Sequence, residues 1–162
     1  LHLYIQILYR RMTVEEIIKA QKSLSLEKKT ILNLTITNQI LAEGFNNVLK
    51  PYELSNEHFN VMRILRGQKN HVLNMKCIQE RMVAKASNTT RLVDKLLIKQ
   101  MVTRKVCPSN RRKIEIQLTG KGFDTLQELD SKVQIYDASL SAKLSTTELQ
   151  QLNDLLDKLR NS

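Results

Sequence analysis

Apolar side chains recur at helical spacing early in the chain. Between Ser25 and Lys50 they stand three, four or seven positions apart, so they share one face of a helix. The residues of this face are Ile31, Leu34, Leu41, Phe45 and Val48. Pro51 marks the end of this helix. A shorter helix is predicted before it over Thr13 to Lys22, with Thr13 as its N-cap.

A further helix is predicted over Asn56 to Arg66, because Ser55 is a good N-cap and a broad apolar face follows it. The residues of that face are Phe59, Val61, Met62, Ile64 and Leu65. Gly67 ends the helix, and the stretch GQKNH that begins there is predicted to be a loop.

Two short helices joined by a tight link come next. The first runs from Asn74 or Met75 to about Met82, and the second is capped by Ser87 and runs to about Lys99. The inner face of the second helix consists of Leu92, Val93, Leu96 and Leu97. Its outer face is expected to hold Asn88, Thr89, Arg91, Lys95 and Lys99. This layout is that of a helix-turn-helix.

Two strands follow the helix-turn-helix. Residues Met101 to Val106 are rich in β-branched side chains, and Lys113 to Leu118 alternate strictly between apolar and polar residues. The stretch CPSNRR between them predicts a loop with two arginines at its distal end. A basic hairpin directly after a helix-turn-helix indicates a winged helix.

The C-terminal part is predicted to be helical. Thr119 caps a helix whose apolar stripe consists of Phe123, Leu126, Leu129 and Val133. A break near Tyr136 to Ser145 precedes a last helix, capped by Ser145 or Thr146, with a seam of Leu149, Leu152, Leu155, Leu156 and Leu159. The fold class is therefore mainly α with a small β-hairpin wing. The winged helix-turn-helix is its core, and helices flank it at both ends.

The distribution of charge along the chain indicates the kind of partner that this fold binds. The chain carries a formal net charge of +10, and residues 74–113 hold eleven basic side chains against two acidic ones. Such clustering favours a polyanionic partner, nucleic acid first and an anionic membrane surface second. No apolar run approaches the ~18 residues of a membrane span. Two cysteines are too few for a disulfide framework, which favours a reducing, cytoplasmic location.

The first eleven residues, LHLYIQILYRR, are apolar but lack the basic start and cleavage site of a signal peptide. Met12 begins a more ordinary sequence. Residues 1–11 are therefore expected to be an extension that was added to the chain or translated from upstream. The alternative is a genuine N-terminal arm that packs on a partner subunit.

The ordered series from Leu54 to Leu129 resembles the MarR family of bacterial winged-helix regulators. Its motifs are ELSNEHFNVMRIL and then NTTRLVDKLLIKQMVTRKVCPSNRRKIEIQLTGKG, followed by a helical tail. The combination is specific, although each piece alone is weak. The helical flanks match the family in layout only.

The resemblance implies a homodimer that binds a pseudo-palindromic operator on double-stranded DNA. It implies a repressor, less often an activator, that is commonly relieved by a small ligand or by oxidation. We expect a small aromatic or phenolic effector that changes the separation of the two recognition helices and so breaks operator binding. On this basis residues 12–53 and 120–162 are expected to form the dimer. Residues 54–119 are expected to form the DNA-binding core.

The chain departs from the family pattern at two positions. Gln100 stands where the family often has Gly, and a left-handed residue there would cost Gln ~1 kcal/mol, so a differently shaped junction is expected. Asn110 stands where the wing usually carries an acid. Asn110 cannot form an ion pair with a wing arginine, so a less rigid wing is expected.

The start of the recognition helix holds the expected base-reading residues, Ser87, Asn88, Thr89 and Arg91. Asn can pair with adenine, Arg with guanine, and Thr can touch a thymine methyl. The alternative for Ser87 is a simple N-cap. For the other three it is a solvated polar face, and Thr90 could pack inward instead.

Other basic residues are expected to contact phosphates, because lysine acts as a flexible point charge. They are Lys76, Lys85, Lys95 and Lys99. Arg111 and Arg112 belong to the wing, and the family resemblance implies that Arg112 reaches into the minor groove. Arg104 is expected either to bridge to phosphate or to brace the wing. Any of the four lysines could instead be merely solvated, and Arg111 and Arg112 could instead belong to a disordered charged loop tip.

An effector pocket is expected between the dimer helices and the winged-helix core. Its candidate residues are Phe45, Tyr52, Phe59 and Met62. The alternative for all four is core packing. Cys77 and Cys107 leave a redox-responsive regulator open, with burial as a small hydrophobe as the other role for Cys77.

No enzyme is expected. The sequence has no phosphate-binding glycine loop, nucleophile elbow or His-Glu zinc motif, so no cofactor is predicted. His2, His58 and His71 lack metal-ligand spacing, and no metal site is predicted. Two other functions stay open: a non-specific architectural or membrane-surface binder that uses the same basic patch, and a repressor that responds to no effector.

Overall fold

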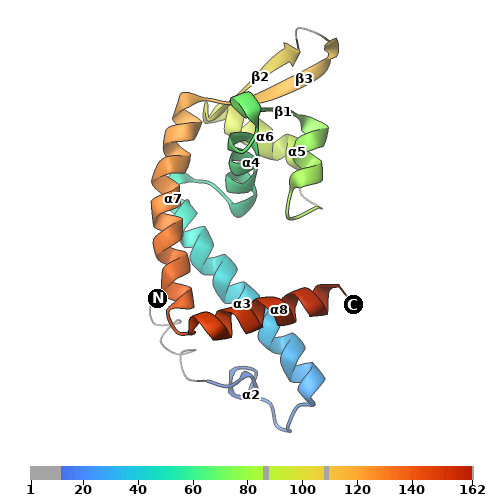
Figure 1. The fold of residues 1–162 in the computed structure, drawn as a ribbon, viewed down its shortest axis with the longest axis vertical. Helices are drawn as coiled ribbons and strands as arrows, with labels where there is room; N and C mark the ends of the chain where they lie inside the picture. Colours follow the sequence, from blue (N-terminus) through green and yellow to red (C-terminus); the bar gives the residue numbers. More distant parts are fainter. Residues whose placement is uncertain (1–11, 86–87, 108–109, 162) are drawn as a thin grey trace. The chain divides into compact units, whose positions relative to one another are not determined.

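The computed structural model describes residues 12–85, 88–107 and 110–161, with the backbone alone for residue 107 and residues 110–113. Figure 1 shows the chain as a ribbon. It divides into two compact units, residues 1–44 and residues 45–162, and the division falls inside one long helix. Each unit is described by itself.

The first unit contains helix α2, Val14–Ile17, and most of helix α3, Leu26–Leu49. Thr13 caps α2 as predicted, in a capping box with Glu16. The predicted extension of this helix to Lys22 is wrong, because Lys19 turns the backbone to a left-handed φ of 51°. Helix α3 agrees with its prediction to within one residue at each end.

The apolar face of α3 is only partly covered within this chain. Ile31 is 56% exposed and Leu41 is 38% exposed, while Leu34 is half-buried. Its C-terminal residues belong to the second unit, where Leu49 is fully buried and Phe45 and Val48 pack against the core.

The second unit is a winged helix followed by two further helices. A 3-10 turn over Lys50–Tyr52 follows α3, and Pro51 lies at its start. The remaining helices are α4 (Asn56–Arg66), a 3-10 turn (Lys69–His71), α5 (Met75–Arg81), α6 (Thr89–Ile98), α7 (Gly120–Ser141) and α8 (Thr146–Arg160). The strands are β1 (Val72–Asn74), β2 (Val102–Cys107) and β3 (Asn110–Leu118).

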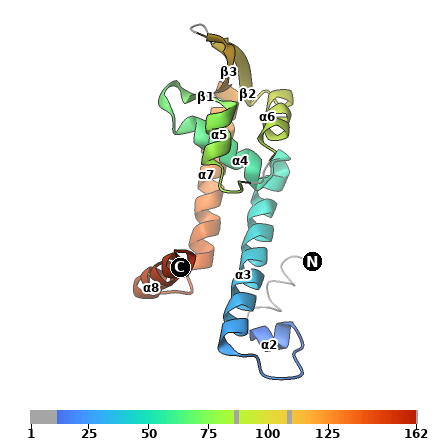
Figure 2. The same ribbon diagram turned by 90° about the vertical axis from the view of Figure 1, so that its right-hand side faces the viewer.

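The three strands form an antiparallel sheet in the order β1-β3-β2. Strand β1 pairs Leu73 with Ile116, and it was not predicted, because three residues are too few to show an alternating pattern. In Figures 1 and 2 the β2–β3 hairpin projects past α4, α5 and α6 as a wing.

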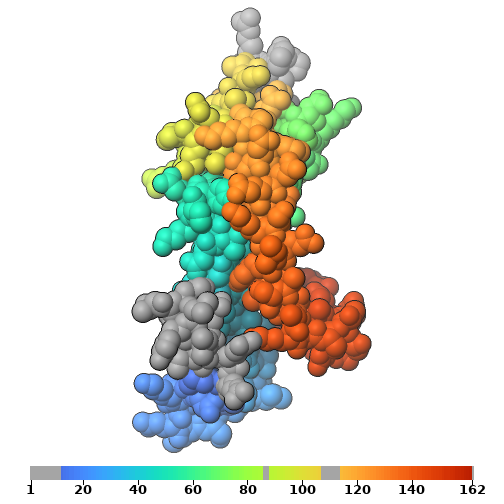
Figure 3. Space-filling view, turned by 90° about the vertical axis from the view of Figure 1, so that its left-hand side faces the viewer, coloured from blue at the N-terminus to red at the C-terminus, as the bar shows by residue number. Residues whose placement is uncertain are grey.

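One core joins the winged helix to α7. Fully buried side chains come from α4, α5, α6, β3 and α7, and they include Val61, Met62, Leu65, Ile78, Val93, Leu96, Ile116, Leu126 and Leu129. Arg66 at the end of α4 pairs with Asp130 of α7 through two hydrogen bonds, at 2.5 and 3.1 Å. In Figure 3 the start of α7, in orange, lies beside the yellow residues of α6 and β2.

The C-terminal helices differ from their prediction in one respect. Helix α7 continues without a break to Ser141, so the break expected from Tyr136 is wrong, and the turn begins only at Ala142. Ser145 caps α8 in a capping box with Glu148, as predicted. In the leucine seam of α8, Leu152 is 44% exposed and Leu155 is 64% exposed.

The junction between α6 and β2 keeps the left-handed shape despite Gln100. Gln100 has φ of 59°. Its N–H donates to the carbonyl of Leu97 at 2.9 Å, and the Met101 N–H donates to Leu96 at 3.0 Å, which together form a Schellman motif. The expectation of a differently shaped junction is therefore wrong, because these two bonds outweigh the strain at Gln100.

Gly122 lets α7 approach this same junction. A β-carbon added at Gly122 would lie 2.2 Å from the carbonyl oxygen of Met101, a contact that no real side chain makes. The Thr119 N–H also donates to that oxygen, at 3.1 Å. The start of α7 therefore fixes the end of the recognition helix.

The strain at Gln100 can be removed by substitution. Gln100→Gly is expected to raise the free energy of unfolding by about 1 kcal/mol, because glycine adopts a positive φ without a steric penalty. Urea unfolding monitored by circular dichroism measures it. Gln100→Ala is the control and is expected to give no such gain. A glycine variant no more stable than the alanine variant would contradict the assignment of strain.

Candidate nucleic-acid interface

The helix-turn-helix begins at two asparagine caps. The Asn74 side chain accepts a hydrogen bond from the Cys77 N–H at 2.9 Å and caps α5. Asn88 accepts one from the Arg91 N–H at 3.2 Å and caps α6. The prediction that Ser87 caps this helix is therefore wrong, and Ser87 itself lies outside the described residues. Because the cap uses Oδ1 of Asn88, this side chain is less suited to bidentate recognition of adenine.

Thr89 and Thr90 exchange the places expected of them. Thr89 is 4% exposed, and its hydroxyl donates to Oε1 of Gln79 on α5. The expectation that Thr89 lies on the outer face is wrong, and Thr90 is exposed instead. The sequence holds the signal that was missed: Thr89 stands four residues before Val93 and seven before Leu96, both fully buried.

The outer face of α6 is a basic stripe. Arg91 and Lys95 stand four residues apart and are both exposed. The apolar Ile98 lies on the same face and is 83% exposed. At 100° per residue this stripe lies opposite Thr89, Val93 and Leu96. We define Thr90, Arg91 and Lys95 as the reading face.

Two of the other basic residues are held by carboxylates. Nζ of Lys99 lies 2.5 Å from Oε2 of Glu53, and this contact lowers the pKa of Glu53. Nη2 of Arg104 lies 2.8 Å from Oδ1 of Asp94, so Arg104 braces the wing against α6. A residue bound in this way is a weaker candidate for a phosphate contact.

Lys76 on α5 and Lys85 in the link after it differ in how far their ammonium groups are available to a phosphate. The side chain of Lys76 is 86% exposed and lies 4.0 Å from Glu80, which leaves it available to a phosphate. Nζ of Lys85 donates to the carbonyl of Glu80 at 2.5 Å and so closes the end of α5.

The second strand of the wing begins three residues earlier than predicted. Strand β3 begins at Asn110, so Arg111 and Arg112 lie within the strand and not in the loop. The backbone of Cys107 pairs with that of Asn110 across the hairpin. The side chains of Cys107, Asn110, Arg111 and Arg112 lie outside the description, and the proposed roles of these residues stay predictions.

His58 is one of the few polar side chains buried in the described part of the chain. It is 6% exposed at the start of α4, and its Nδ1 accepts a hydrogen bond from the Ser55 N–H at 3.1 Å. Burial lowers the pKa of His58, and the charges of Lys95 and Lys99 lower it further, while Glu57 opposes them. His58 is therefore neutral at pH 7 and packs toward the recognition helix.

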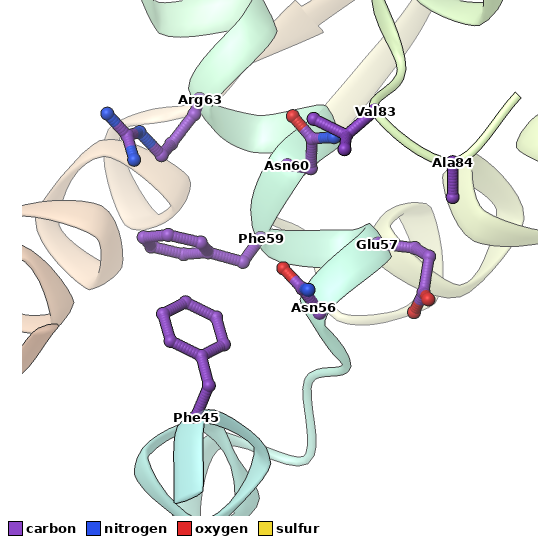
Figure 4. A pocket seen from close by; sticks show the side chains of 8 residues that line it. All are labelled: Phe45, Asn56, Glu57, Phe59, Asn60, Arg63, Val83 and Ala84. Atoms are coloured by element: carbon purple, nitrogen blue, oxygen red, sulfur yellow. The ribbon is translucent and has the colours of Figure 1, made fainter. Parts of the chain in front are cut away.

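A pocket of about 220 Å³ opens beside α4, as Figure 4 shows. It is lined by Phe45, Asn56, Glu57, Phe59, Asn60, Arg63, Val83 and Ala84. The rings of Phe45 and Phe59 meet edge to face at 5.6 Å, and the Arg63 guanidinium lies 5.7 Å from the Phe59 ring centre. Val83 and Ala84 belong to the link between α5 and α6.

Two of the four expected pocket residues do not line this pocket. Met62 is fully buried in the core. Tyr52 instead bonds with α7, because its hydroxyl donates to Glu128 and accepts from Lys132 at 2.6 Å. For Met62 the alternative of core packing is the one observed.

Among the described residues, no three histidine, cysteine or carboxylate side chains gather in a way that could hold a metal ion. Cys77 is half-buried and unbonded to another cysteine. No helix of the described ranges is long and apolar enough to cross a membrane.

A basic helix-turn-helix followed by a β-hairpin wing defines a winged helix-turn-helix protein. Residues 54–114 match the model of the MarR family. Together with the relatives below, this match shows that the chain is similar to the transcriptional regulators of the MarR family.

Similar proteins extend the likeness beyond residues 54–114. The transcriptional repressor MprA of Escherichia coli K12 is 29% identical over 119 residues, which are 74% of this chain and 68% of MprA. A MarR transcription factor from Planctomyces limnophilus is 28% identical with a TM-score of 0.65, over 84% of this chain and 98% of that one. The organohalide-sensing transcriptional regulator RdhR in its 2,4-dichlorophenol-bound form shares the fold, with a TM-score of 0.77 at 20% identity, over 86% and 82% of the two chains.

The buried His58 predicts a pH dependence of stability. Its pKa in the folded chain lies below the ordinary value of 6.5, so the unfolded chain binds a proton more readily. The stability that neutral His58 contributes is present above pH 6.5 and is lost as the pH falls from 6.5 toward the folded pKa. His58→Gln keeps a side chain that can complete the capping box and does not titrate.

Urea midpoints at pH 7.5 and 5.5 measure the difference. The wild type is expected to lose more stability between these values than His58→Gln. The carboxylates titrate in both proteins, so the difference between them isolates His58. Equal losses would show that His58 does not contribute.

Proposed function

We propose that this protein is a sequence-specific, double-stranded-DNA-binding repressor that acts as a homodimer. The observation that carries the proposal is the reading face of α6. It lies opposite the buried stripe of the same helix, and it stands in the most basic stretch of the chain. A recognition helix of this kind enters the major groove.

The residues of the reading face have distinct proposed roles. Arg91 suits a guanine, whose O6 and N7 accept two hydrogen bonds from a guanidinium. Thr90 takes over the thymine-methyl contact first expected of Thr89. Lys95 and Lys76 are proposed to contact phosphates, which position the helix without reading sequence. Arg111 and Arg112 are proposed to follow the minor groove from the wing.

Exposed apolar side chains support a dimer. Ile135 on α7 is 71% exposed, and Leu152 and Leu155 on α8 are 44% and 64% exposed. A soluble protein rarely leaves such rows uncovered, and a second copy of the chain would cover them with the same rows. The two recognition helices are then proposed to reach major grooves ~34 Å apart.

The pocket beside α4 supports a small aromatic or phenolic effector. Two rings form one wall, and Arg63 supplies a cation for a phenolate or carboxylate. RdhR is known with 2,4-dichlorophenol bound. Val83 and Ala84 also line the pocket, and they belong to the link that leads to α6. A bound ligand could therefore change the free energy of DNA binding by about 1–3 kcal/mol, the usual range for coupling between two sites.

The proposal predicts different effects for two neighbouring residues. Arg91→Ala should cost roughly 1–3 kcal/mol of binding to the specific site and relax base preference at one position. Lys95→Ala should weaken all duplexes about equally and lower the salt dependence. The measurement is fluorescence anisotropy on the palindromic duplex upstream of the protein's own gene and on a scrambled duplex, across a salt series.

The wild type sets the reference for this experiment. A ratio of specific to scrambled affinity of ~10³ or more is expected. Equal affinity for both duplexes would leave a non-specific basic winged helix. Equal effects of both substitutions on both duplexes would contradict the assigned roles.

The proposed dimer predicts that a charge in the leucine seam separates the subunits. Leu152→Asp and Leu155→Asp should each yield a monomer, because a buried unpaired carboxylate costs several kcal/mol. Sedimentation velocity measures the mass. Gln151→Asp adds the same charge at a polar position of α8 and should stay dimeric. Leucine variants that also stay dimeric would place the interface elsewhere.

A further inference from the structure

Gln79 connects three parts of the helix-turn-helix. It lies half-buried on α5. Its Nε2 donates to the backbone carbonyl of Lys85 in the link, at 2.7 Å, and its Oε1 accepts the hydrogen bond from Thr89 on α6. A single amide therefore bonds α5 both to the link and to the first residue of the recognition helix.

The two partners fix which way the amide points. A carbonyl oxygen can only accept, so the NH₂ group must face Lys85. The oxygen is then left for the Thr89 hydroxyl, which donates to it. Both bonds are satisfied in one orientation only, so Gln79 holds the link and α6 at the same time.

The burial of Thr89 makes its hydroxyl dependent on Gln79 as a hydrogen-bond partner. Thr89 is 4% exposed, so its hydroxyl has little water to bond with if Gln79 moves away. A buried hydroxyl without a partner is unfavourable, and this keeps the first turn of α6 against α5. That turn also carries Thr90 and Arg91, which face outward.

Among the described residues, the other side chains that hold α6 through ion pairs lie further along the helix. Asp94 pairs with Arg104 of the wing, and Lys99 pairs with Glu53 before α4. The first buried apolar residue, Val93, comes a full turn after Thr89. The N-terminal turn, which would carry the base-reading side chains, therefore depends on Gln79 for its placement.

We propose that Gln79 is a positioning residue for DNA recognition, which sets the register of Thr90 and Arg91 on the base edges without touching DNA. This inference rests on the proposed function. When Gln79 is removed, the first turn of α6 can shift against α5. The phosphate contacts of flexible lysines then survive, whereas the directional base contacts do not.

The experiment uses the wild-type chain, four single variants and the double variant of Gln79→Leu with Thr89→Val. Gln79→Leu removes both bonds at similar volume, and Thr89→Val removes the hydroxyl and keeps the shape. Thr89→Ser retains a hydroxyl as the conservative rescue. Gln127→Leu, at an exposed position on α7, is the matched control. The probes are a duplex selected from a random pool by the wild-type protein and a scrambled duplex of the same composition, each titrated across a salt series.

Gln79→Leu and Thr89→Val are each expected to weaken binding to the selected duplex at least tenfold. Binding to the scrambled duplex and the salt slope should stay within twofold. The double variant should lose no more than Gln79→Leu alone, because both changes break the same bond. Thr89→Ser and Gln127→Leu should bind as the wild type does.

Circular dichroism at the assay temperature confirms that each variant is folded. Folded variants with an unchanged specificity ratio would overturn the positioning role, and so would a uniform loss on both duplexes. A wild-type protein that does not discriminate the two duplexes would instead refute the proposed function. The two failures are therefore distinguishable. If Gln79→Leu does not fold, Thr89→Val carries the test alone.

Discussion

The burial of one face of α6 determines how the rest of the winged helix can be used. Val93 and Leu96 are fully buried, and Thr89 continues their stripe toward the start of the helix. Because a helix turns 100° per residue, this burial leaves only the opposite side for a partner. Arg91 and Lys95 face outward for that reason, and not because they are basic.

Local signals in the sequence identify most of the fold, and long-range contacts explain where they fail. The caps at Ser55, Thr119 and Ser145 were predictable, because each depends on residues within one turn. Strand β1 was not, because its three residues are ordered by pairing with β3, more than forty positions away. The exchange of Thr89 and Thr90 arose because the inner face of α6 was taken to begin at Leu92, whereas Thr89 stands four residues before Val93 and so shares its buried face.

The number of basic residues in the sequence is larger than the number whose side chains are available to contact DNA. Lys99 and Arg104 both count toward the basic stretch, yet Glu53 and Asp94 hold them. Glu53 comes from outside that stretch, so no local count could reveal the pair. The ion pairs serve a structural purpose, because they connect α6 to the wing and to the segment before α4. In the proposed complex with DNA, specificity would then depend on few exposed groups, with Arg91 the principal directional donor among the described residues.

The link between α5 and α6 is where ligand binding and DNA reading can meet. Val83 and Ala84 form one wall of the pocket, and the next residue, Lys85, is held by Gln79, which also bonds to Thr89. If the proposed effector displaced the link, it would strain this pair of bonds. The strain falls on the first turn of α6, which carries Thr90 and Arg91. Coupling through this short path requires no rearrangement of the core, because Val93 and Leu96 remain buried while the turn before them shifts.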